Sequence, residues 1–345
     1  MISISHLTPW QDPRGGNVQR ILLDNGIIKL EVLSLGGIIR TLEVADKHGT
    51  ADNIVLGCDN IEDYLAQQAH LGAVAGRYAN RVANGQFSYQ GQTYQLSVNQ
   101  ASNCLHGGEQ GFNLKHWQMQ AIEDGVRLTL LSPDGDMGFP GNCQVQLDYR
   151  LNENKLMVEF TATTDKPCPV SLTQHSYFNL GGSQCQTNTE HLIEVDAKQY
   201  MTMNEVGVPT AMVATQGSDL DLSTPTPMSV QSQRPALAAT NGFDHCYVLA
   251  QQPGKLTRFG SVSHPSSGRI MTVYTNQVGV QLYGANFLEG TIGYAKQVYQ
   301  NYQAVCIEPQ LIPDSPNQPQ LPGAQMTTPE QPYKHVSCYE FTVKG

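Results

Sequence analysis

Short segments in which apolar and polar residues alternate recur along most of the chain, and they predict β-strands. The pattern covers residues 27–33, 38–44, 53–57, 145–149, 156–160, 246–249, 270–274, 278–283 and 338–343. Around Gln90-Gly91 and Asp124-Gly125 the alternation continues on both sides of a tight-turn pair, so residues 87–98 and 117–132 predict hairpins. Strands at hairpin spacing predict an all-β chain, folded as a large antiparallel β-sandwich or a distorted barrel.

Helical periodicity is almost absent from this pattern. Only residues 60–75 suggest a helix, with Asn60 as the N-cap, acidic residues in the first turn, and Leu65 and Leu71 as apolar positions. Residues 214–241 are rich in Ser, Thr, Pro, Gln and Ala, and fit either a linker or a long surface excursion from one domain.

A short apolar run at residues 304–307 predicts a buried strand that leads into Glu308. Period 2 places Ala304, Cys306 and Glu308 on one face of it. Because ionisation is costly at a buried strand end, we expect a raised pKa for Glu308, as a general base requires. We expect Pro309 to end the strand, since proline donates no ladder hydrogen bond. The alternative is an ion-paired, structural glutamate.

A second informative segment, residues 170–182, has polar side chains on one face and mostly apolar side chains on the other. The polar face carries Ser171, Thr173, His175, Tyr177 and Asn179. This stripe predicts a wet groove with donors and acceptors for a polyhydroxy ligand, and His175 as a proton carrier that titrates near neutrality. An ordinary solvent-facing strand is the alternative.

Five further residues could bind a ligand, and each also has an ordinary structural interpretation. His106 precedes two glycines, so the backbone can turn sharply and let a ligand approach. Residues 76–85 contain Arg77 and Arg81, whose guanidinium groups suit vicinal hydroxyls or structural ion pairs. Asp244 can accept hydroxyl protons or cap a turn, and Gln281 faces either a groove or solvent.

Composition narrows the function classes. With 20 basic against 30 acidic residues the net charge is −10, which argues against a nucleic-acid surface and weakly against highly anionic substrates. We find no secretory signal and no run near the roughly 18 apolar residues of a membrane span. Eight scattered cysteines without a C-x-x-C pair predict reduced thiols and a cytoplasmic enzyme. His335 with Cys338, and Cys104 with His106, are too isolated for zinc, so we expect no metal site.

Six strings, taken in order, resemble the aldose 1-epimerase (galactose mutarotase) family. They are G-R-Y-A-N-R at 76–81, N-C-L-H-G-G at 103–108, H-S-Y-F-N-L-G-G at 175–182, D-H-C-Y-V-L at 244–249, G-V-Q-L-Y at 279–283 and E-P-Q-x-x-P-D-S-P-N-Q-P at 308–319. Leu311-Ile312 departs from the pattern, because the family usually has an aromatic residue there.

The resemblance implies one galactose-mutarotase-like β-sandwich domain over residues 1–345, which makes residues 214–241 a loop. It implies a cofactor-free site for a small-molecule aldose substrate, such as free galactose or glucose. We expect neither nucleic acid nor membrane as a partner, and a monomer or weak dimer. Glu308 would be the catalytic base and His175 the catalytic acid. The sugar would be held by His106, Asp244, Arg81, Asn80 and Gln281.

Three other functions remain open from the sequence. A non-catalytic carbohydrate-binding protein would use the same groove without turnover. A hexose-6-phosphate epimerase would need a cationic cluster, for which Arg77 and Arg81 are the only close arginine pair near the candidate site. A glycosidase would need two carboxylates at a set separation, and only Glu308 is a firm candidate.

Overall fold

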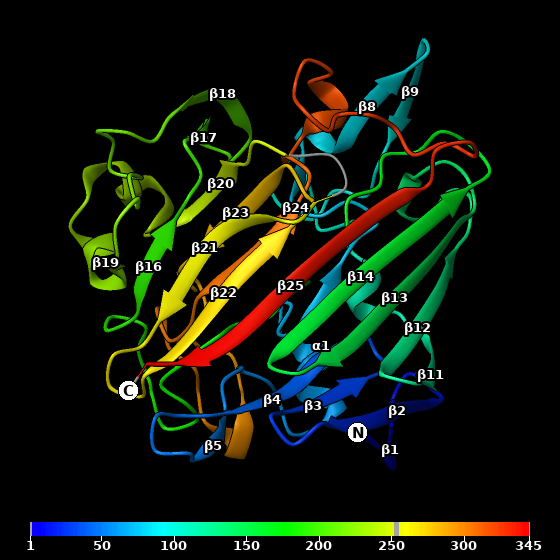
Figure 1. Cartoon of the computed structure of the whole chain (residues 1–345). Coiled ribbons are helices and arrows are strands. Elements are labelled where there is room, and N and C mark those ends of the chain that lie inside the picture. Colours follow the sequence, from blue (N-terminus) through cyan, green and yellow to red (C-terminus); the bar gives the residue numbers. More distant parts are fainter. Residues whose placement is uncertain (1, 252–254, 345) are drawn as a thin grey trace.

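Antiparallel sheets make up nearly all of the regular structure (Figure 1). The computed structural model describes residues 2–251 and 255–344. Within these ranges the strands form one nine-stranded sheet, two five-stranded sheets and three two-stranded ribbons.

The nine-stranded sheet runs diagonally across the front of Figure 1. Its strands, in spatial order, are β11 (Gln118–Ile122), β12 (Gly125–Ser132), β13 (Cys143–Asn152), β14 (Lys155–Thr164), β25 (Tyr333–Val343), β22 (Arg269–Thr275), β21 (Thr257–Ser263), β16 (Leu192–Val195) and β19 (Thr226–Pro227).

The N-terminal five-stranded sheet follows chain order, with β1 (Ser3–Gln11), β2 (Asn17–Asp24), β3 (Ile28–Leu33), β4 (Ile39–Ala45) and β5 (Ala51–Asn53). The other five-stranded sheet has the order β18 (Pro209–Ala214), β17 (Gln199–Met203), β20 (Asp244–Val248), β23 (Gly279–Tyr283) and β24 (Cys306–Gln310). The ribbons pair β10 (Cys104–Leu105) with β7 (Arg81–Val82), β15 (Thr173–His175) with β6 (Ala73–Ala75), and β8 (Gln86–Tyr89) with β9 (Gln92–Gln95).

Helical segments are short. They are α1 (Ile61–Ala66) and the 3₁₀ turns η1 (Ala83–Gly85), η2 (Phe112–Leu114), η3 (Asp136–Gly138), η4 (Met228–Ser232), η5 (Pro235–Thr240), η6 (Tyr294–Lys296) and η7 (Ser315–Asn317). No helix in the described ranges is long and apolar enough to cross a membrane.

Alternation of side chains explains how the layers pack. In β14 every second residue is buried, including Leu156, Val158 and Phe160, and these side chains belong to the same core cluster as Leu282 of β23 and Ile307 of β24. The Tyr339 hydroxyl of β25 also donates to the Ile307 carbonyl at 3.2 Å. The nine-stranded sheet therefore packs against the β20–β23–β24 sheet, which confirms the predicted all-β sandwich.

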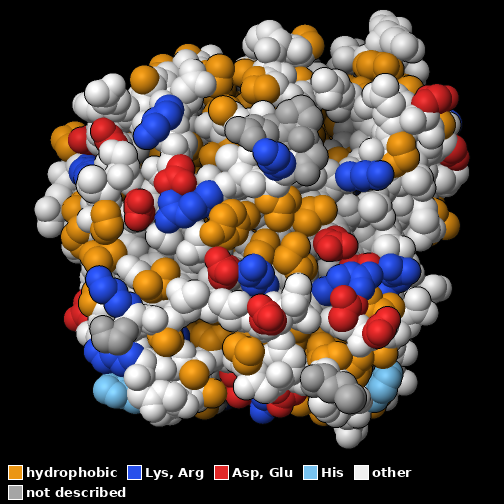
Figure 2. Space-filling view, viewed as in Figure 1, with side chains coloured by type: hydrophobic (Ala, Val, Ile, Leu, Met, Phe, Trp, Pro, Cys, Tyr) orange, Lys and Arg blue, Asp and Glu red, His pale blue; other side chains and the backbone are white. Residues whose placement is uncertain are grey.

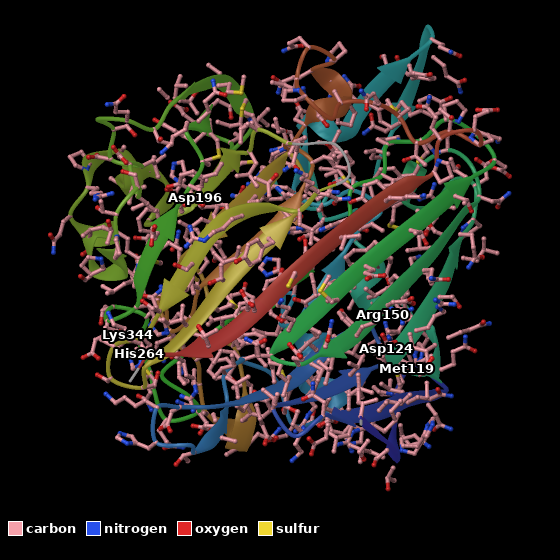
Figure 3. The ribbon with its side chains drawn as sticks, in the orientation of Figure 1. Met119, Asp124, Arg150, Asp196, His264 and Lys344 are labelled. Atoms are coloured by element: carbon pink, nitrogen blue, oxygen red, sulfur yellow. The ribbon has the colours of Figure 1, made fainter. Side chains whose placement is uncertain are left out.

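The outer face of the nine-stranded sheet is mixed in character. Figure 2 shows hydrophobic side chains gathered near the middle of this face, with charged groups around them. At its lower right in Figure 3, Arg150 of β13 lies beside Asp124 of the β11–β12 turn, and the two form an ion pair. Arg150 also contacts Asp148 at 2.9 Å, so this guanidinium group is paired with two carboxylates.

Both hairpins predicted from the alternation are confirmed. Strands β8 and β9 pair Phe87 with Tyr94 around Gln90-Gly91, and β11 pairs with β12 so that Ile122 faces Gly125. All eight cysteines are free thiols, as predicted.

The helix predicted over residues 60–75 is correct only in its first half. Asn60 is the N-cap, accepting a hydrogen bond from the Asp63 amide at 2.8 Å, but α1 ends at Ala66 and residues 73–75 form β6. Long-range pairing overrides the local pattern, because the Gly72 amide donates to the His175 carbonyl at 3.0 Å and β6 pairs with β15. The strand predicted over 53–57 is also shifted, since β5 ends at Asn53.

Candidate functional site

An open cavity of about 810 Å³ gathers polar side chains from distant parts of the sequence. Its floor comes from β15, β20, β23 and β24, and its walls come from residues 65–70, 99–114 and 287–291. Seven residues that the sequence nominated all line it: Asn80, Arg81, His106, His175, Asp244, Gln281 and Glu308.

Strand register brings the carboxyl and imidazole groups together. Phe178 and Val305 form a doubly hydrogen-bonded antiparallel pair, with N–O distances of 2.8 and 2.9 Å. His175 precedes Phe178 by three residues and Glu308 follows Val305 by three, so the same register sets the two side chains opposite each other. The Nε2 atom of His175 lies 3.5 Å from the Oε2 atom of Glu308.

The prediction that Pro309 ends its strand is wrong. Strand β24 continues to Gln310, so Glu308 is the third of its five residues rather than its terminus, and Pro309 lies opposite Val280. Proline is tolerated because β24 is the last strand of its five-stranded sheet, where one side of the backbone is not required for the ladder.

Burial controls the carboxyl group of Glu308, as predicted. The residue is only 2% exposed, and this desolvation raises its pKa well above the usual value, with Asp244 adding to the rise and Arg81 opposing it. Its Oε2 atom has no hydrogen-bond partner among the described residues. Glu308 is therefore a poorly solvated carboxyl group with a raised proton affinity and an oxygen that is free to contact a ligand.

The expectation that His175 titrates near neutrality is wrong. Burial, together with the neighbouring His70, lowers the pKa of His175 to about 3. The ring is 5% exposed and Nδ1 has no partner within the described ranges. Burial therefore disfavours the charged form of each of these two side chains and favours the uncharged carboxyl–imidazole pair over the ion pair.

The predicted polar stripe over residues 171–179 reaches the cavity at two positions only, His175 and Tyr177. Ser171 accepts a hydrogen bond from the Leu311 amide at 3.1 Å, and Asn179 donates to the Gln303 carbonyl at 2.7 Å. Thr173 is completely buried. This segment lies inside the protein, so Ser171 and Asn179 bind neighbouring backbone instead of lining a groove. Thr173 Oγ1 and Ser176 Oγ have no hydrogen-bond partner among the described residues.

His106 is fixed by reciprocal bonds with Asn80. The His106 amide donates to the Asn80 carbonyl at 3.0 Å, and the Asn80 amide donates to His106 Nδ1 at 3.2 Å. Nδ1 therefore acts as an acceptor, and Nε2 carries the hydrogen of the neutral ring. Burial lowers the pKa of His106 well below its usual value, and His70 and His175 contribute, so this ring is a neutral N–H donor.

Gly107 makes this arrangement sterically allowed. It adopts a φ of +92°, and a Cβ atom there would lie 1.9 Å from the Gly76 carbonyl oxygen. The sequence pattern of a histidine before glycines thus reflects a real close approach of two backbone segments.

A metal ion is not the natural occupant of this cluster. One donor atom from each of His106, His175 and Glu308 lies within 4.8 Å of the others, which alone would suit a cation. However, His106 Nδ1 already accepts the Asn80 N–H, and Nε2 carries a proton. The donor set therefore fits hydrogen bonding to hydroxyl groups better than metal ligation.

The two arginines have different roles. Arg77 is buried outside the cavity, where its guanidinium donates to the carbonyls of Pro140, Gly141 and Ser132. Arg81 lines the cavity and donates through Nε to Gln100 at 2.7 Å. Among the described cavity residues, Arg81 is the single Lys or Arg.

Asp244 and Gln281 form a hydrogen-bonded pair on adjacent strands. The Gln281 amide donates to Asp244 Oδ1 at 2.5 Å, while Gln281 Oε1 has no partner among the described residues. Both residues line the cavity, and Gln281 pairs with Glu308 across the ladder, so the two side chains offer acceptors and a donor for vicinal hydroxyls beside Glu308.

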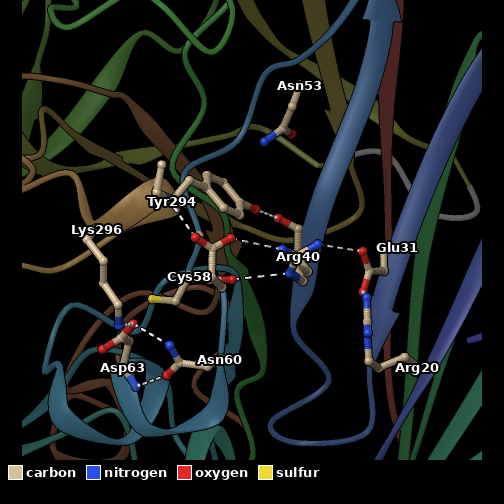
Figure 4. Close-up of polar contacts among 12 residues, drawn as sticks. Arg20, Glu31, Arg40, Asn53, Cys58, Asn60, Asp63, Tyr294 and Lys296 are labelled. Atoms are coloured by element: carbon tan, nitrogen blue, oxygen red, sulfur yellow. Dashed lines mark hydrogen bonds and ion pairs between the residues drawn. The ribbon is translucent and has the colours of Figure 1, made fainter. Parts of the chain in front are cut away.

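Ion pairs and hydrogen bonds join η6 to α1 and to the N-terminal sheet (Figure 4). Lys296 contacts Asp63 at 2.7 Å, and the Tyr294 hydroxyl donates to the Arg40 carbonyl. Arg40 in turn contacts Glu31 at 2.7 Å. These contacts fix α1 and η6, which adjoin in sequence the wall segments 65–70 and 287–291.

Sequence reasoning missed several cavity residues, among them His70, Gln100 and Tyr283. His70 stands inside the predicted helix, so the wrong helix prediction concealed it. Gln100 and Tyr283 belong to ordinary polar and alternating patterns. Only the tertiary contacts identify them.

An antiparallel β-sandwich with a buried carboxyl–imidazole pair at an open, polar cavity is the arrangement expected of an enzyme that moves protons on a small polar molecule. Comparison with known proteins identifies the group to which the chain belongs. The sequence model of the family described as Aldose 1-epimerase matches residues 19–340, and the chain belongs to this family.

Relatives agree with this assignment over nearly their whole length. The chain is 38% identical to a galactose mutarotase of Homo sapiens over 332 residues, covering 95% of each chain. It is 33% identical to an aldose 1-epimerase of Escherichia coli (strain K12) over 345 residues, covering 97% of this chain and 98% of the other.

Solved structures share the architecture. An aldose epimerase homologue from C. elegans has a TM-score of 0.84 at 25% identity, covering 93% of this chain and 97% of that one. A galactose 1-epimerase from Lactobacillus acidophilus has a TM-score of 0.85 at 24% identity with full coverage of both chains, which shows the common fold.

Proposed function

We propose that this protein is an aldose 1-epimerase that interconverts the α and β anomers of free aldohexoses such as galactose and glucose. The observation that carries the proposal is the 3.5 Å contact between His175 Nε2 and Glu308 Oε2 at the base of the cavity. Anomer exchange requires one group that removes a proton from the C1 hydroxyl and one that delivers a proton to O5.

In the proposed mechanism Glu308 is the base and His175 the acid. Glu308 takes the proton of the C1 hydroxyl while His175 protonates O5, the C1–O5 bond breaks, and C1 becomes an aldehyde carbon. Rotation about C1–C2 presents the other carbonyl face, and the reverse transfers close the ring. Each transfer typically contributes about 10²–10⁴-fold in rate.

Burial of Glu308 and His175 favours the ring-opening step of this cycle. The ion-paired form of Glu308 and His175 and their uncharged form contain the same number of protons. Because desolvation raises the pKa of Glu308 and lowers that of His175, the uncharged form is favoured in the buried site. Ring opening from the ion-paired form ends in the uncharged form, so burial favours the transfer that breaks C1–O5.

The remaining residues have binding roles in this proposal. His106 donates from Nε2 and Arg81 from its guanidinium group, while Asp244 and Gln281 accept or donate at adjacent hydroxyls. Asn80 positions His106 and Arg81 through its backbone and its side-chain oxygen, which accepts from the Arg81 amide at 2.8 Å.

A hexose 6-phosphate is a poorer substrate for this cavity. Arg77 is committed to backbone carbonyls, so one of the two arginines that a phosphate site would need is absent from the described lining. Four acidic residues also line it: Glu109, Asp244, Glu289 and Glu308. We therefore expect free sugars to be turned over and sugar phosphates to compete weakly.

The proposal also includes the number of domains, the oligomeric state and the cellular location. Residues 1–345 form one domain, supported by a hydrophobic cluster that contains Ile21 near one end and Phe341 near the other. The protein acts without a cofactor, as a monomer or weak dimer in the cytoplasm, where eight free thiols remain reduced.

Polarimetry on freshly dissolved α-D-galactose and α-D-glucose tests the proposal. An enzyme accelerates the decay of optical rotation to its equilibrium value in proportion to protein concentration. A protein that binds these sugars without accelerating the decay would be a carbohydrate-binding protein instead. Galactose 6-phosphate added as a competitor tests the preference for free sugars.

A further inference from the structure

A third imidazole, that of His70, lies against the two histidines of the proposed site. Its ring centroid is 4.8 Å from that of His106 and 6.1 Å from that of His175. The mechanism above assigns it no role.

The backbone holds His70 firmly in this place. The residue has a φ of +57°, an uncommon conformation for a side chain of this size. The Ala73 amide donates to its carbonyl at 2.9 Å, and the adjoining Gly72 amide donates to the His175 carbonyl at 3.0 Å. The turn that carries His70 is therefore anchored to the strand that carries His175.

A hydrogen bond also determines which ring nitrogen of His70 carries the hydrogen. Nδ1 lies 3.0 Å from the Gln68 carbonyl oxygen, which can only accept, so Nδ1 carries the hydrogen. Within the described ranges the ring has no other hydrogen bond. Burial lowers the pKa of His70, which keeps the ring neutral and leaves Nε2 as an acceptor. His70 is thus an acceptor, whereas His106 is a donor.

Together with the proposed roles of Glu308 and His175, the order of residues across the floor orients a sugar relative to His70. Asp244 bonds Gln281, Gln281 pairs with Glu308, Glu308 contacts His175, and His175 is followed by His70. With the C1 hydroxyl at Glu308 and O5 at His175, C2 lies towards Gln281 and Asp244. The atoms beyond O5, which are C5 and its hydroxymethyl group, lie towards His70.

We propose, on the basis of the epimerase function above, that His70 is a specificity residue whose Nε2 accepts a hydrogen bond from the 6-hydroxyl group of an aldohexose. It selects aldohexoses over 6-deoxy sugars of the same configuration. A neutral hydrogen bond of this kind corresponds to roughly a 3- to 10-fold preference.

The experiment compares D-galactose with 6-deoxy-D-galactose, which differs by this one hydroxyl. The wild-type protein should prefer galactose by about 3- to 10-fold in kcat/KM. His70→Phe keeps a planar ring but lacks the acceptor, so it should lower kcat/KM for galactose alone and bring the ratio close to one. His70→Gln restores an acceptor and should recover part of the preference.

Asp244→Asn is the matched control at the opposite end of the floor. It should reduce kcat/KM for both sugars by the same factor and leave the ratio unchanged. A wild-type ratio of one, or a His70→Phe variant that weakens both sugars equally, would overturn the assignment of His70 while leaving the epimerase function intact. A wild-type protein that mutarotates neither sugar would refute the function itself.

Discussion

Replacing Glu308 by glutamine should separate catalysis from stability. The change removes the base but keeps the shape of a side chain that is 3% exposed and 3.5 Å from His175. Loss of a general base typically costs about 100- to 10,000-fold, which corresponds to about 2.7–5.4 kcal/mol of transition-state stabilisation. We expect kcat for α-D-galactose to fall by at least about two orders of magnitude.

The same substitution should leave the folding stability at pH 7 unchanged or increase it. Burial raises the pKa of Glu308 above its ordinary value of 4.5, so the unfolded chain releases this proton at lower pH than the folded chain does. The wild-type protein therefore loses stability as the pH rises above about 4.5, up to the folded pKa. A neutral amide escapes this loss, and Glu308→Gln should unfold at the same or a higher temperature at pH 7.

The assay is the initial rate of optical-rotation decay after α-D-galactose is dissolved, corrected for the spontaneous reaction, with a thermal melt of each variant. Glu289→Gln is the control, because it makes the same carboxyl-to-amide change in an exposed residue that lines the same cavity. His175→Asn should show a loss similar to that of Glu308→Gln. If Glu308→Gln keeps kcat within about tenfold of wild type while remaining folded, Glu308 is not the base.

Three other outcomes follow from the structure. Asp244→Ala should chiefly raise KM for galactose in steady-state polarimetry, since hydroxyl contacts are made in ground and transition states alike, and an unchanged KM would make Asp244 structural. Gly107→Ala should lower the free energy of unfolding in urea by about 3 kcal/mol or more, because its Cβ would lie 1.9 Å from the Gly76 carbonyl; a loss below about 1 kcal/mol would contradict this clash. Burial lowers the pKa of His335 to about 3, so the unfolded chain binds this proton first and stability should fall as the pH drops from about 6.5 towards 3. His335→Gln should flatten that dependence by up to about 1.4 kcal/mol per pH unit, and equal slopes in the two proteins would refute it.

Several elements of the fold could be predicted from residues that are close together in the sequence. The β8–β9 and β11–β12 hairpins follow from alternation and turn residues a few positions apart, and the Asn60 cap follows from one side chain and an amide three residues later. Where a local sequence pattern and long-range strand pairing favoured different structures, the long-range pairing determined the structure. Residues 73–75 resemble a helix but become a strand, because β15 offers them a ladder of backbone hydrogen bonds.

The sequence by itself determined the strands, the turns and the identity of the acid–base candidates, since Glu308 and His175 stand in motifs that neighbouring residues define. Only the tertiary structure decided what those groups can do. The register between Phe178 and Val305 sets their separation, and enclosure by several sheets shifts both pKa values. Distance and desolvation depend on contacts more than a hundred residues apart, and no local pattern of side chains contains that information.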